Sequence, residues 1–375
     1  MPRSVIVPAG ALLAALLGGV AVLGAAAPAP AVPEPAAPAP VQSTAALEKP
    51  LTLVVFDRAD ISYVPPAEGV APAPVPRGDV IVSDSGQTLE RTVTLPADPG
   101  VRAAVGVTGV VTVEPLVDPN QPPRPGDPWT RMGSVGVMLP VGGGKPPMQV
   151  ELMRFVTGFG AASRFECDLT AFMPVLWGER TLRLHLGTWK SPGWRVTFEL
   201  KYEPGAAGMR RASTVVPLMW EEKVTAAAPR LQGAFTLLPG TDRPRIRVVS
   251  TGHGSQKGDE FHPRTHVLRV DGVEVARWRP WREDGNRARG ANPWAERRKA
   301  DGREVWASDA DRSGWIPGRL VDPFLLPLDD LAPGRHRVEL EVLDLKPAGP
   351  GETPNSWCVS VCLLADEAWP RSAAP

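Results

Sequence analysis

Strict alternation of apolar and polar residues is the feature that most limits how this chain can fold. In "WRVTFELKY", from Trp194 to Tyr202, apolar side chains take every second position, and Arg, Thr, Glu and Lys take the positions between them. Successive side chains of a β-strand point to opposite faces, so the pattern predicts an antiparallel strand with one buried face. The segments "TLRLHL", "RHRVELEVLD" and "WCVSVCLL" alternate in the same way.

The segments between these runs favour turns over helices. "HVLRVDGVEV" predicts a hairpin whose two-residue turn is Asp271 and Gly272. Only "DLTAFMPVLWGE" predicts a short helix, with Asp168 as its N-cap. Many short strands with almost no helix predict an all-β fold of antiparallel β-sandwiches.

The length of the chain fits two domains. Its 375 residues suffice for two units that each bury a core. The segment "KYEPGAAGMRRAS" ends one alternating run with small residues before another begins. We therefore expect an N-terminal sandwich over residues 51–208 and a C-terminal sandwich over residues 209–375.

The first fifty residues have the composition of an export signal and a tether. Arg3 precedes a long apolar run that ends in Ala25, Ala26 and Ala27, which predicts for residues 1–27 a cleaved signal peptide or an uncleaved signal anchor. Residues 28–50 are rich in Pro and Ala and predict an extended tether. The chain is therefore expected to be exported: secreted, periplasmic or anchored to the outer side of a membrane.

Charge argues against one class of partner. Lys plus Arg equals Asp plus Glu at 41 each, so the chain lacks the net positive charge that displaces counterions from nucleic acid. Contact with a membrane is expected only through the N-terminal segment.

The cysteines and histidines argue against a local disulfide and a metal site. Cys358 and Cys362 stand four strand steps apart, about 13 Å, which is beyond disulfide reach. Free thiols are therefore favoured, although Cys167 could reach either cysteine through the tertiary fold. His262 and His266 flank Pro263 in a β pattern, where their rings would be too far apart for one tetrahedral ion. We expect no metal and no cofactor.

Tryptophans in loops are the remaining candidates for ligand contact. Trp129, Trp189 and Trp315 lie beside Gly, Pro or charged residues. Flat aromatic faces beside acids and arginines suit sugar rings, which stack on the indole while their hydroxyls form hydrogen bonds. The alternative is that these tryptophans fill cores and anchor loops.

Several of these segments, taken in order, resemble the peptide-N-glycosidase F family. "RFVTGFG" and "FECDLTAFMPVLWGERTLRLHLGTWK" are similar to its first domain, and "STGHGSQKGDEFHPRTHVLRV" and "DADRSGWIPG" to its second. The similarity runs from about Val110 to Leu364. It implies two stacked eight-stranded antiparallel jelly-roll sandwiches and an activity that cleaves the amide between N-acetylglucosamine and asparagine. Three acids are associated with the site where the domains of the family meet.

Only one of those acids is present at its position here. Glu260 matches the first, whereas Thr130 and Gly187 stand where the family has the other two. Asp127, three residues before Thr130, is the candidate for a relocated acid. The resemblance makes Glu260 and Asp127 the candidate catalytic residues. It also places the candidate glycan-binding side chains in the same cleft: Trp129, Arg131, Trp189, His253, Arg312 and Trp315.

Three functions are consistent with this pattern. The first is an amidase acting on N-linked glycans of a glycoprotein, and the second is a glycan-binding protein that has lost catalysis. The third is a copper monooxygenase of the same two-sandwich architecture, which five scattered histidines fit poorly. We also expect Arg312 to face Glu260 rather than Asp309 or Asp311, and the protein to be a monomer.

Overall fold

The computed structural model describes residues 49–97, 105–120, 122–140, 146–205, 212–254, 258–347 and 355–367. Residues 44–375 belong to one compact unit. The predicted signal segment (residues 1–27), nearly all of the predicted tether and the predicted boundary at residue 208 lie outside the described residues, so the division into domains stays a prediction. Among the described residues, no helix is long and apolar enough to cross a membrane.

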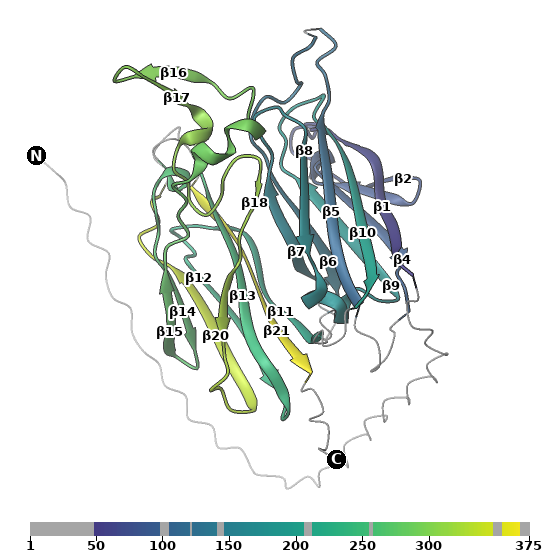
Figure 1. Cartoon of the computed structure of the whole chain (residues 1–375), viewed down its shortest axis with the longest axis vertical. Helices are drawn as coiled ribbons and strands as arrows, with labels where there is room; N and C mark the ends of the chain where they lie inside the picture. Colours follow the sequence, from purple (N-terminus) through teal and green to yellow (C-terminus); the bar gives the residue numbers. More distant parts are fainter. Residues whose placement is uncertain are drawn as a thin grey trace, which may run out of the picture. The chain divides into compact units, whose positions relative to one another are not determined.

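The first half of the chain folds into two antiparallel sheets that enclose a large apolar core (Figure 1). The first sheet has the strand order β1 (Leu51–Ile61), β10 (Trp194–Pro204), β5 (Val105–Pro115), β8 (Ser163–Asp168). The second has the order β18 (Arg319–Leu320), β7 (Met148–Val156), β6 (Met132–Leu139), β9 (Glu179–Leu186), β4 (Thr88–Thr94), β3 (Val80–Ser83), β2 (Val75–Arg77).

Strand β10 follows the alternation of its sequence. The polar residues of the alternating stretch are half-buried. The five apolar side chains between them are fully buried: Trp194, Val196, Phe198, Leu200 and Tyr202. The central position of β10, between β1 and β5, explains why even its outer face is partly covered.

The second half folds into another pair of antiparallel sheets around its own apolar core. One sheet has the order β11 (Ala212–Val224), β21 (Ser356–Glu367), β13 (Thr241–His253), β19 (Phe324–Pro327). The other has the order β12 (Arg230–Leu237), β20 (Gly334–Val342), β14 (His266–Val270), β15 (Val273–Trp278). A separate two-stranded ribbon joins β16 (Arg297–Ala300) to β17 (Arg303–Trp306). The expected all-β fold of stacked antiparallel sandwiches is confirmed.

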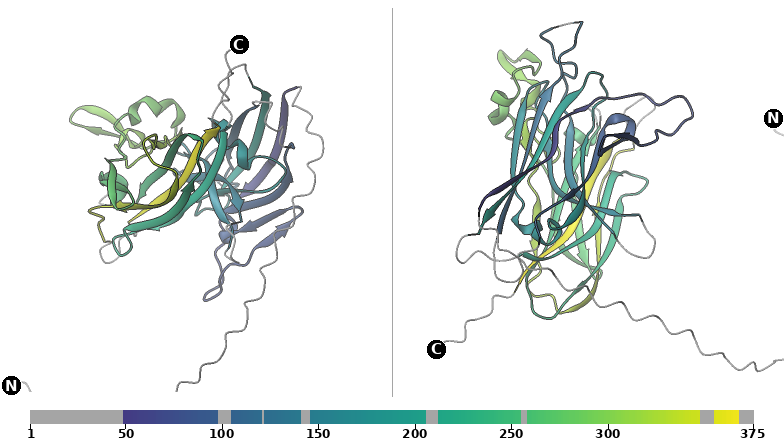
Figure 2. Two further views of the ribbon diagram at one scale, coloured as in Figure 1. Left: turned by 90° about the horizontal axis from the view of Figure 1, so that it is seen from below. Right: turned by 90° about the vertical axis from the view of Figure 1, so that its right-hand side faces the viewer.

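The two pairs of sheets, seen as separate groups of strands in Figure 2, also share material. The short strand β18 comes from the second half of the chain but pairs with β7 of the first. Cys362 and Leu364 of β21 are buried in the core of the first half. This exchange ties the two halves together beyond simple surface contact.

The hairpin turn has the structure predicted from its sequence, whereas the expected helix differs from its prediction. Asp271 and Gly272 join β14 to β15 with φ of 50° and 82°, the left-handed pair that a two-residue hairpin turn requires. The expected helix is a single 3₁₀ segment, η3 (Thr170–Val175), which contains Pro174. The prediction of Asp168 as the N-cap is wrong by one residue, because Leu169 occupies that position. Asp168 still accepts a hydrogen bond from the N–H of Thr170 at 2.9 Å. The other 3₁₀ segments among the described residues are η1 (Asp84–Gly86), η4 (Asp259–Phe261), η5 (Gly285–Ala291) and η6 (Ala307–Asp309).

The cysteines are free thiols. Cys358 and Cys362 are buried on β21, and Cys167 is partly buried on β8. Burial raises the pKa of Cys358 to about 12 and that of Cys362 to about 11. These thiols therefore behave as apolar core side chains and not as nucleophiles.

A fully buried ion pair joins β7 to the second half of the chain. Arg154 binds both carboxylate oxygens of Glu151, at 2.7 and 2.9 Å. Its remaining nitrogen donates to Thr251 Oγ1 at 3.0 Å and to the carbonyl of Cys358 at 2.6 Å. The Ser360 hydroxyl donates to Glu151. Four of the five Arg154 N–H groups and both Glu151 carboxylate oxygens are thus hydrogen-bonded where β7, β13 and β21 meet.

We expect the Arg154→Met variant to lose about 3–5 kcal/mol of unfolding free energy, because Glu151 would remain buried without its cation. Urea denaturation measures the loss. The matched control is Arg195→Met, which removes an exposed pair with Asp60 and should cost under about 1 kcal/mol. Equal losses in the two variants would contradict a special role for the buried pair.

Candidate functional site

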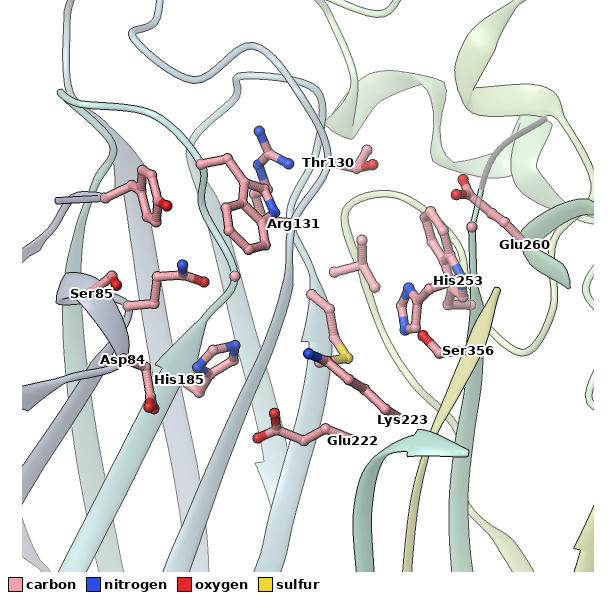
Figure 3. A pocket seen from close by; sticks show the side chains of 18 of the residues that line it. Asp84, Ser85, Thr130, Arg131, His185, Glu222, Lys223, His253, Glu260 and Ser356 are labelled. Carbon is pink, nitrogen blue, oxygen red and sulfur yellow. The ribbon is translucent and has the colours of Figure 1, made fainter. Parts of the chain in front are cut away.

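A pocket of about 640 Å³ is lined by side chains from both halves of the chain (Figure 3). Its volume lies within the range of small-molecule sites. Seven of the positions singled out from the sequence line it: Thr130, Arg131, Gly187, Trp189, His253, Glu260 and Trp315. The pocket is therefore the candidate site.

Glu260 is held at the pocket wall by the short segment η4. Its carbonyl accepts a hydrogen bond from the N–H of Ser313 at 3.0 Å, and the Ser313 hydroxyl binds the carbonyl of Asp259 at 2.6 Å. The Glu260 side chain is 20% exposed. Burial raises its pKa to about 7, against the lowering effect of the nearby Arg312 guanidinium. Near neutral pH the carboxyl group can therefore hold or release a proton.

Arg312 is the ion-pair partner of Glu260. Its Nε lies 3.5 Å from Glu260 Oε1, a distance that gives charge attraction without a well-formed hydrogen bond. The other guanidinium nitrogens donate to the carbonyls of Ala310 and Ala307 at 2.8 and 2.9 Å. Asp309 pairs with Arg289 instead. Arg312 thus contacts Glu260, although its own side chain does not line the pocket.

Trp315 and His253 form the wall beside Glu260. Trp315 is buried, donates its Nε1–H to the carbonyl of Gly252 at 3.0 Å and lies under the Arg312 guanidinium, 4.8 Å from its carbon. His253 stacks on Trp315 with ring centres 6.1 Å apart, and its Nε2 hydrogen-bonds Thr251 Oγ1 at 2.9 Å. Burial, with Arg154 nearby, lowers the pKa of His253 to about 3, so the ring is neutral.

Asp127 lies in the core rather than in the pocket. It is fully buried and accepts two hydrogen bonds from Arg131, at 2.7 and 2.9 Å. Thr188 Oγ1 donates to it at 2.6 Å and Trp194 Nε1 at 3.3 Å. These donors occupy both carboxylate oxygens. The placement favours a supporting role, in which Asp127 joins the Trp129–Arg131 loop to the loop after β9, over the predicted catalytic role.

The two positions without the expected acids do face the pocket. Thr130 is half-buried on the wall, and Gly187 follows β9. A Cβ added at Gly187 would have its nearest neighbour, Nε2 of His185, at 3.5 Å. Gly187 therefore has room for a larger side chain, and the absence of a carboxylate at both positions is a property of the sequence.

Two exposed aromatic side chains mark the rim. Trp189 is 62% exposed and lies 5.2 Å from Tyr63, ring centre to ring centre. Both line the pocket, whereas Trp129 is 54% exposed and does not. The sequence analysis did not identify Tyr63, because no local pattern distinguishes it. Only the fold brings the segment after β1 next to the loop after β9.

Sequence reasoning also missed four further ionisable residues that line the pocket: Asp84, His185, Glu222 and Lys223. Asp84, His185 and Glu222 lie on the side of the pocket away from Glu260 (Figure 3). The alternation of "TLRLHL" does place His185 on the face opposite Leu184 and Leu186. That signal shows that His185 leaves the core but cannot show what it faces.

The histidines expected not to bind metal have protein partners. His262 Nδ1 lies 2.8 Å from the carbonyl of Gly258, and His266 Nε2 lies 2.8 Å from Ser250 Oγ. Within the described ranges, no cluster of three or more His, Cys, Asp or Glu side chains could hold a metal ion.

We expect the Asp127→Ala variant to lose about 3 kcal/mol of unfolding free energy, because Arg131 loses its counter-ion and two further donors lose their acceptor. Thermal or urea unfolding measures this, with the exposed Asp57→Ala of β1 as the control at under about 0.5 kcal/mol. Unchanged stability with abolished activity would instead assign Asp127 to catalysis.

Comparison with known proteins agrees with the fold. The family model described as "Peptide-N-glycosidase F, C terminal" matches residues 222–364. A search of curated proteins finds no match.

Solved structures match over most of the chain at low sequence identity. PNGF-II is 21% identical with a TM-score of 0.70, over 85% of this chain and 66% of that protein, so this chain spans about two thirds of its length. PNGase F, a glycosylasparaginase from Flavobacterium meningosepticum, is 19% identical with a TM-score of 0.63, over 85% and 96%. A peptide-N(4)-(N-acetyl-β-D-glucosaminyl) asparagine amidase is 20% identical with a TM-score of 0.65, over 86% and 98%. Residues 222–364 thus match the family of peptide-N-glycosidase F C-terminal domains, and the chain as a whole has a peptide-N-glycosidase F-like fold.

Proposed function

We propose that the pocket binds the core of an N-linked glycan on a glycoprotein and hydrolyses the amide between its first N-acetylglucosamine and asparagine. The observation that carries this proposal is Glu260, a carboxyl group with its pKa raised to about 7 on the wall of a pocket of about 640 Å³. The cleft lies between the two sandwiches. Amidases acting on this bond share the fold, which supports the choice of substrate.

Glu260 supplies the proton that amide cleavage needs. When water adds to the carbonyl carbon and the C–N bond breaks, the departing nitrogen must be protonated. A carboxyl group that is still partly protonated at neutral pH can donate that proton. The products are aspartate on the protein and a glycosylamine. Arg312, 3.5 Å away, then stabilises the carboxylate that remains.

The rim provides the surface for the sugar. The exposed indole of Trp189 offers an apolar face on which the C–H side of a sugar ring can stack, and Tyr63 supports it. Arg131 lines the wall beside Thr130 with its guanidinium anchored by Asp127. A pre-positioned donor of this kind orients hydroxyl or acetamido oxygens at little entropic cost.

The second candidate is a glycan-binding protein without hydrolysis. The observation that favours it is that Thr130 and Gly187, both on the pocket wall, carry no carboxylate. For either function we also propose, from the N-terminal sequence pattern, that the protein is exported. A monomeric state stays a prediction.

The Glu260→Gln variant tests the proposal. We expect about a 10²-fold or greater loss of deglycosylation, because glutamine cannot donate a proton to the leaving nitrogen. A gel shift of a denatured N-glycoprotein, with mass spectrometry of the asparagine-to-aspartate conversion, measures it. Activity of the wild type should fall as pH rises above about 7, where Glu260 loses its proton. Glu283→Gln, at an exposed position, is the control. A wild type that binds the glycoprotein without converting asparagine would favour the second candidate.

The Thr130→Asp variant should gain deglycosylating activity over the wild type. The side chain faces the pocket beside Arg131, whose positive charge favours an ionised carboxylate there. A general base is worth about 10²–10⁴-fold, so even a misplaced one should give a measurable increase. Thr130→Asn, of the same size without the charge, is the control, and an equal rate in the two variants would contradict the prediction.

A further inference from the structure

The side of the pocket opposite Glu260 holds a chain of three hydrogen-bonded side chains. The hydroxyl of Thr88 donates to Asp84 Oδ2 at 2.6 Å. The oxygen of this Thr88 hydroxyl also lies 2.8 Å from His185 Nδ1. Thr88 is fully buried on β4, and His185 is its direct neighbour across the sheet on β9. Asp84, His185 and Glu222 appear together in Figure 3.

The backbone holds Asp84 in place for this contact. Asp84, Ser85 and Gly86 all have left-handed φ, of 50°, 56° and 87°. A Cβ at Gly86 would lie 2.2 Å from the carbonyl oxygen of Ser62, so only glycine fits there. Consecutive strained residues cost free energy and persist only where the surroundings hold them. Here the result is a carboxylate fixed against Thr88.

The direction of the hydrogen bonds fixes the tautomer of His185. A threonine hydroxyl has one proton, and the carboxylate of Asp84 takes it. The Thr88 oxygen must then accept the Nδ1–H of His185, which leaves a lone pair on Nε2. Among the described residues, no hydrogen bond to that nitrogen is found, and His185 lines the pocket. Burial lowers the pKa of His185, so the ring is neutral near pH 7.

His185 Nε2 also lies close to the position that a side chain at Gly187 would occupy. It is the nearest atom, at 3.5 Å, to a Cβ built at Gly187. An acceptor nitrogen therefore occupies the neighbourhood that a longer side chain at Gly187 would enter.

We propose that His185, oriented by Thr88 and Asp84, is the proton acceptor of this pocket and replaces the carboxylate absent at Gly187. The inference rests on the proposed amidase function for the identity of the reaction. As water attacks the amide carbonyl carbon, one O–H bond breaks and its proton moves to His185 Nε2. The C–N bond then breaks as Glu260 gives its proton to the nitrogen. The imidazolium finally returns a proton to the Glu260 carboxylate, so both groups regain their starting state.

The charges around His185 define the pH range of this step. Asp84 on η1 and Glu222 on β11 raise its pKa, and Arg183 on its own strand lowers it, but burial outweighs them. Lys223 of β11 lines the same pocket. The base is therefore available above a pKa lower than 6.5, and the acid Glu260 below about 7. Because the base titrates below the acid, both are in their working states in one window, and the pH–rate profile is bell-shaped.

The kinetic test uses the full chain. We expect His185→Gln to lower kcat/KM for the glycoprotein about 10²-fold or more and to remove the acidic limb of the profile. Asp84→Asn keeps a side chain that tolerates the left-handed backbone but removes the charge, so the acidic limb should move to lower pH. Thr88→Val should also lower kcat/KM. Its matched control on the same strand is Thr92→Val, whose exposed hydroxyl hydrogen-bonds that of Thr181. An unchanged acidic limb in His185→Gln would overturn the proposal.

A second measurement separates this proposal from the amidase function. Long-range proton–nitrogen NMR of the imidazoles, with the His185 signals assigned by their loss in His185→Gln, reports which ring nitrogen carries the proton. We expect an unprotonated Nε2 in the wild type that shifts on addition of N,N′-diacetylchitobiose. If the wild type hydrolyses no glycoprotein, the amidase proposal fails, and the tautomer decides the role of His185 as acceptor. A protonated Nε2, or no shift with the disaccharide, would overturn it.

Discussion

The buried pair of Glu151 and Arg154 is the contact on which the rest of the structure depends. It lies on β7, which pairs with β6 and β18, and its remaining donors and acceptors reach β13 and β21 of the second pair of sheets. Arg247 of β13 adds hydrogen bonds to the carbonyls of Glu151 and Leu152, at 3.0 and 3.2 Å. Charges removed from water are tolerated only where such partners are complete. The requirement fixes how the two halves meet and therefore which side chains face the pocket.

The same principle separates the structural carboxylates of this protein from the one proposed to be catalytic. Asp127 and Glu151 are each surrounded by donors that fill their oxygens, so they hold loops and strands in place. Glu260 is also largely buried but has a single cationic neighbour at 3.5 Å. Incomplete compensation raises its pKa toward neutrality, which is what proton transfer requires. The chemistry proposed for the pocket therefore depends on a carboxyl group that the fold leaves under-stabilised.

The two sides of the pocket are formed by different halves of the chain. Glu260, Arg312 and the stacked Trp315 and His253 belong to the second half of the chain. Asp84, His185, Thr130 and the exposed Trp189 belong to the first. A substrate bound between them would contact both halves, so the proposed function depends on how the halves pack against each other.

The sequence by itself determined the local structure of this protein. The alternation of residues 194–202 required a strand with one buried face, and Asp271 with Gly272 required a tight hairpin turn, because both depend only on neighbours in the chain. The motifs, which occur in the same order as in the resembled family, also identified Glu260 and Trp189 as candidate site residues. The tertiary structure alone decided that Asp127 is enclosed by Thr188 and Trp194 and that Thr88 joins Asp84 to His185. Those contacts link residues up to 97 positions apart, and the burial that sets their protonation depends on what the folded chain packs around them, which no local pattern records.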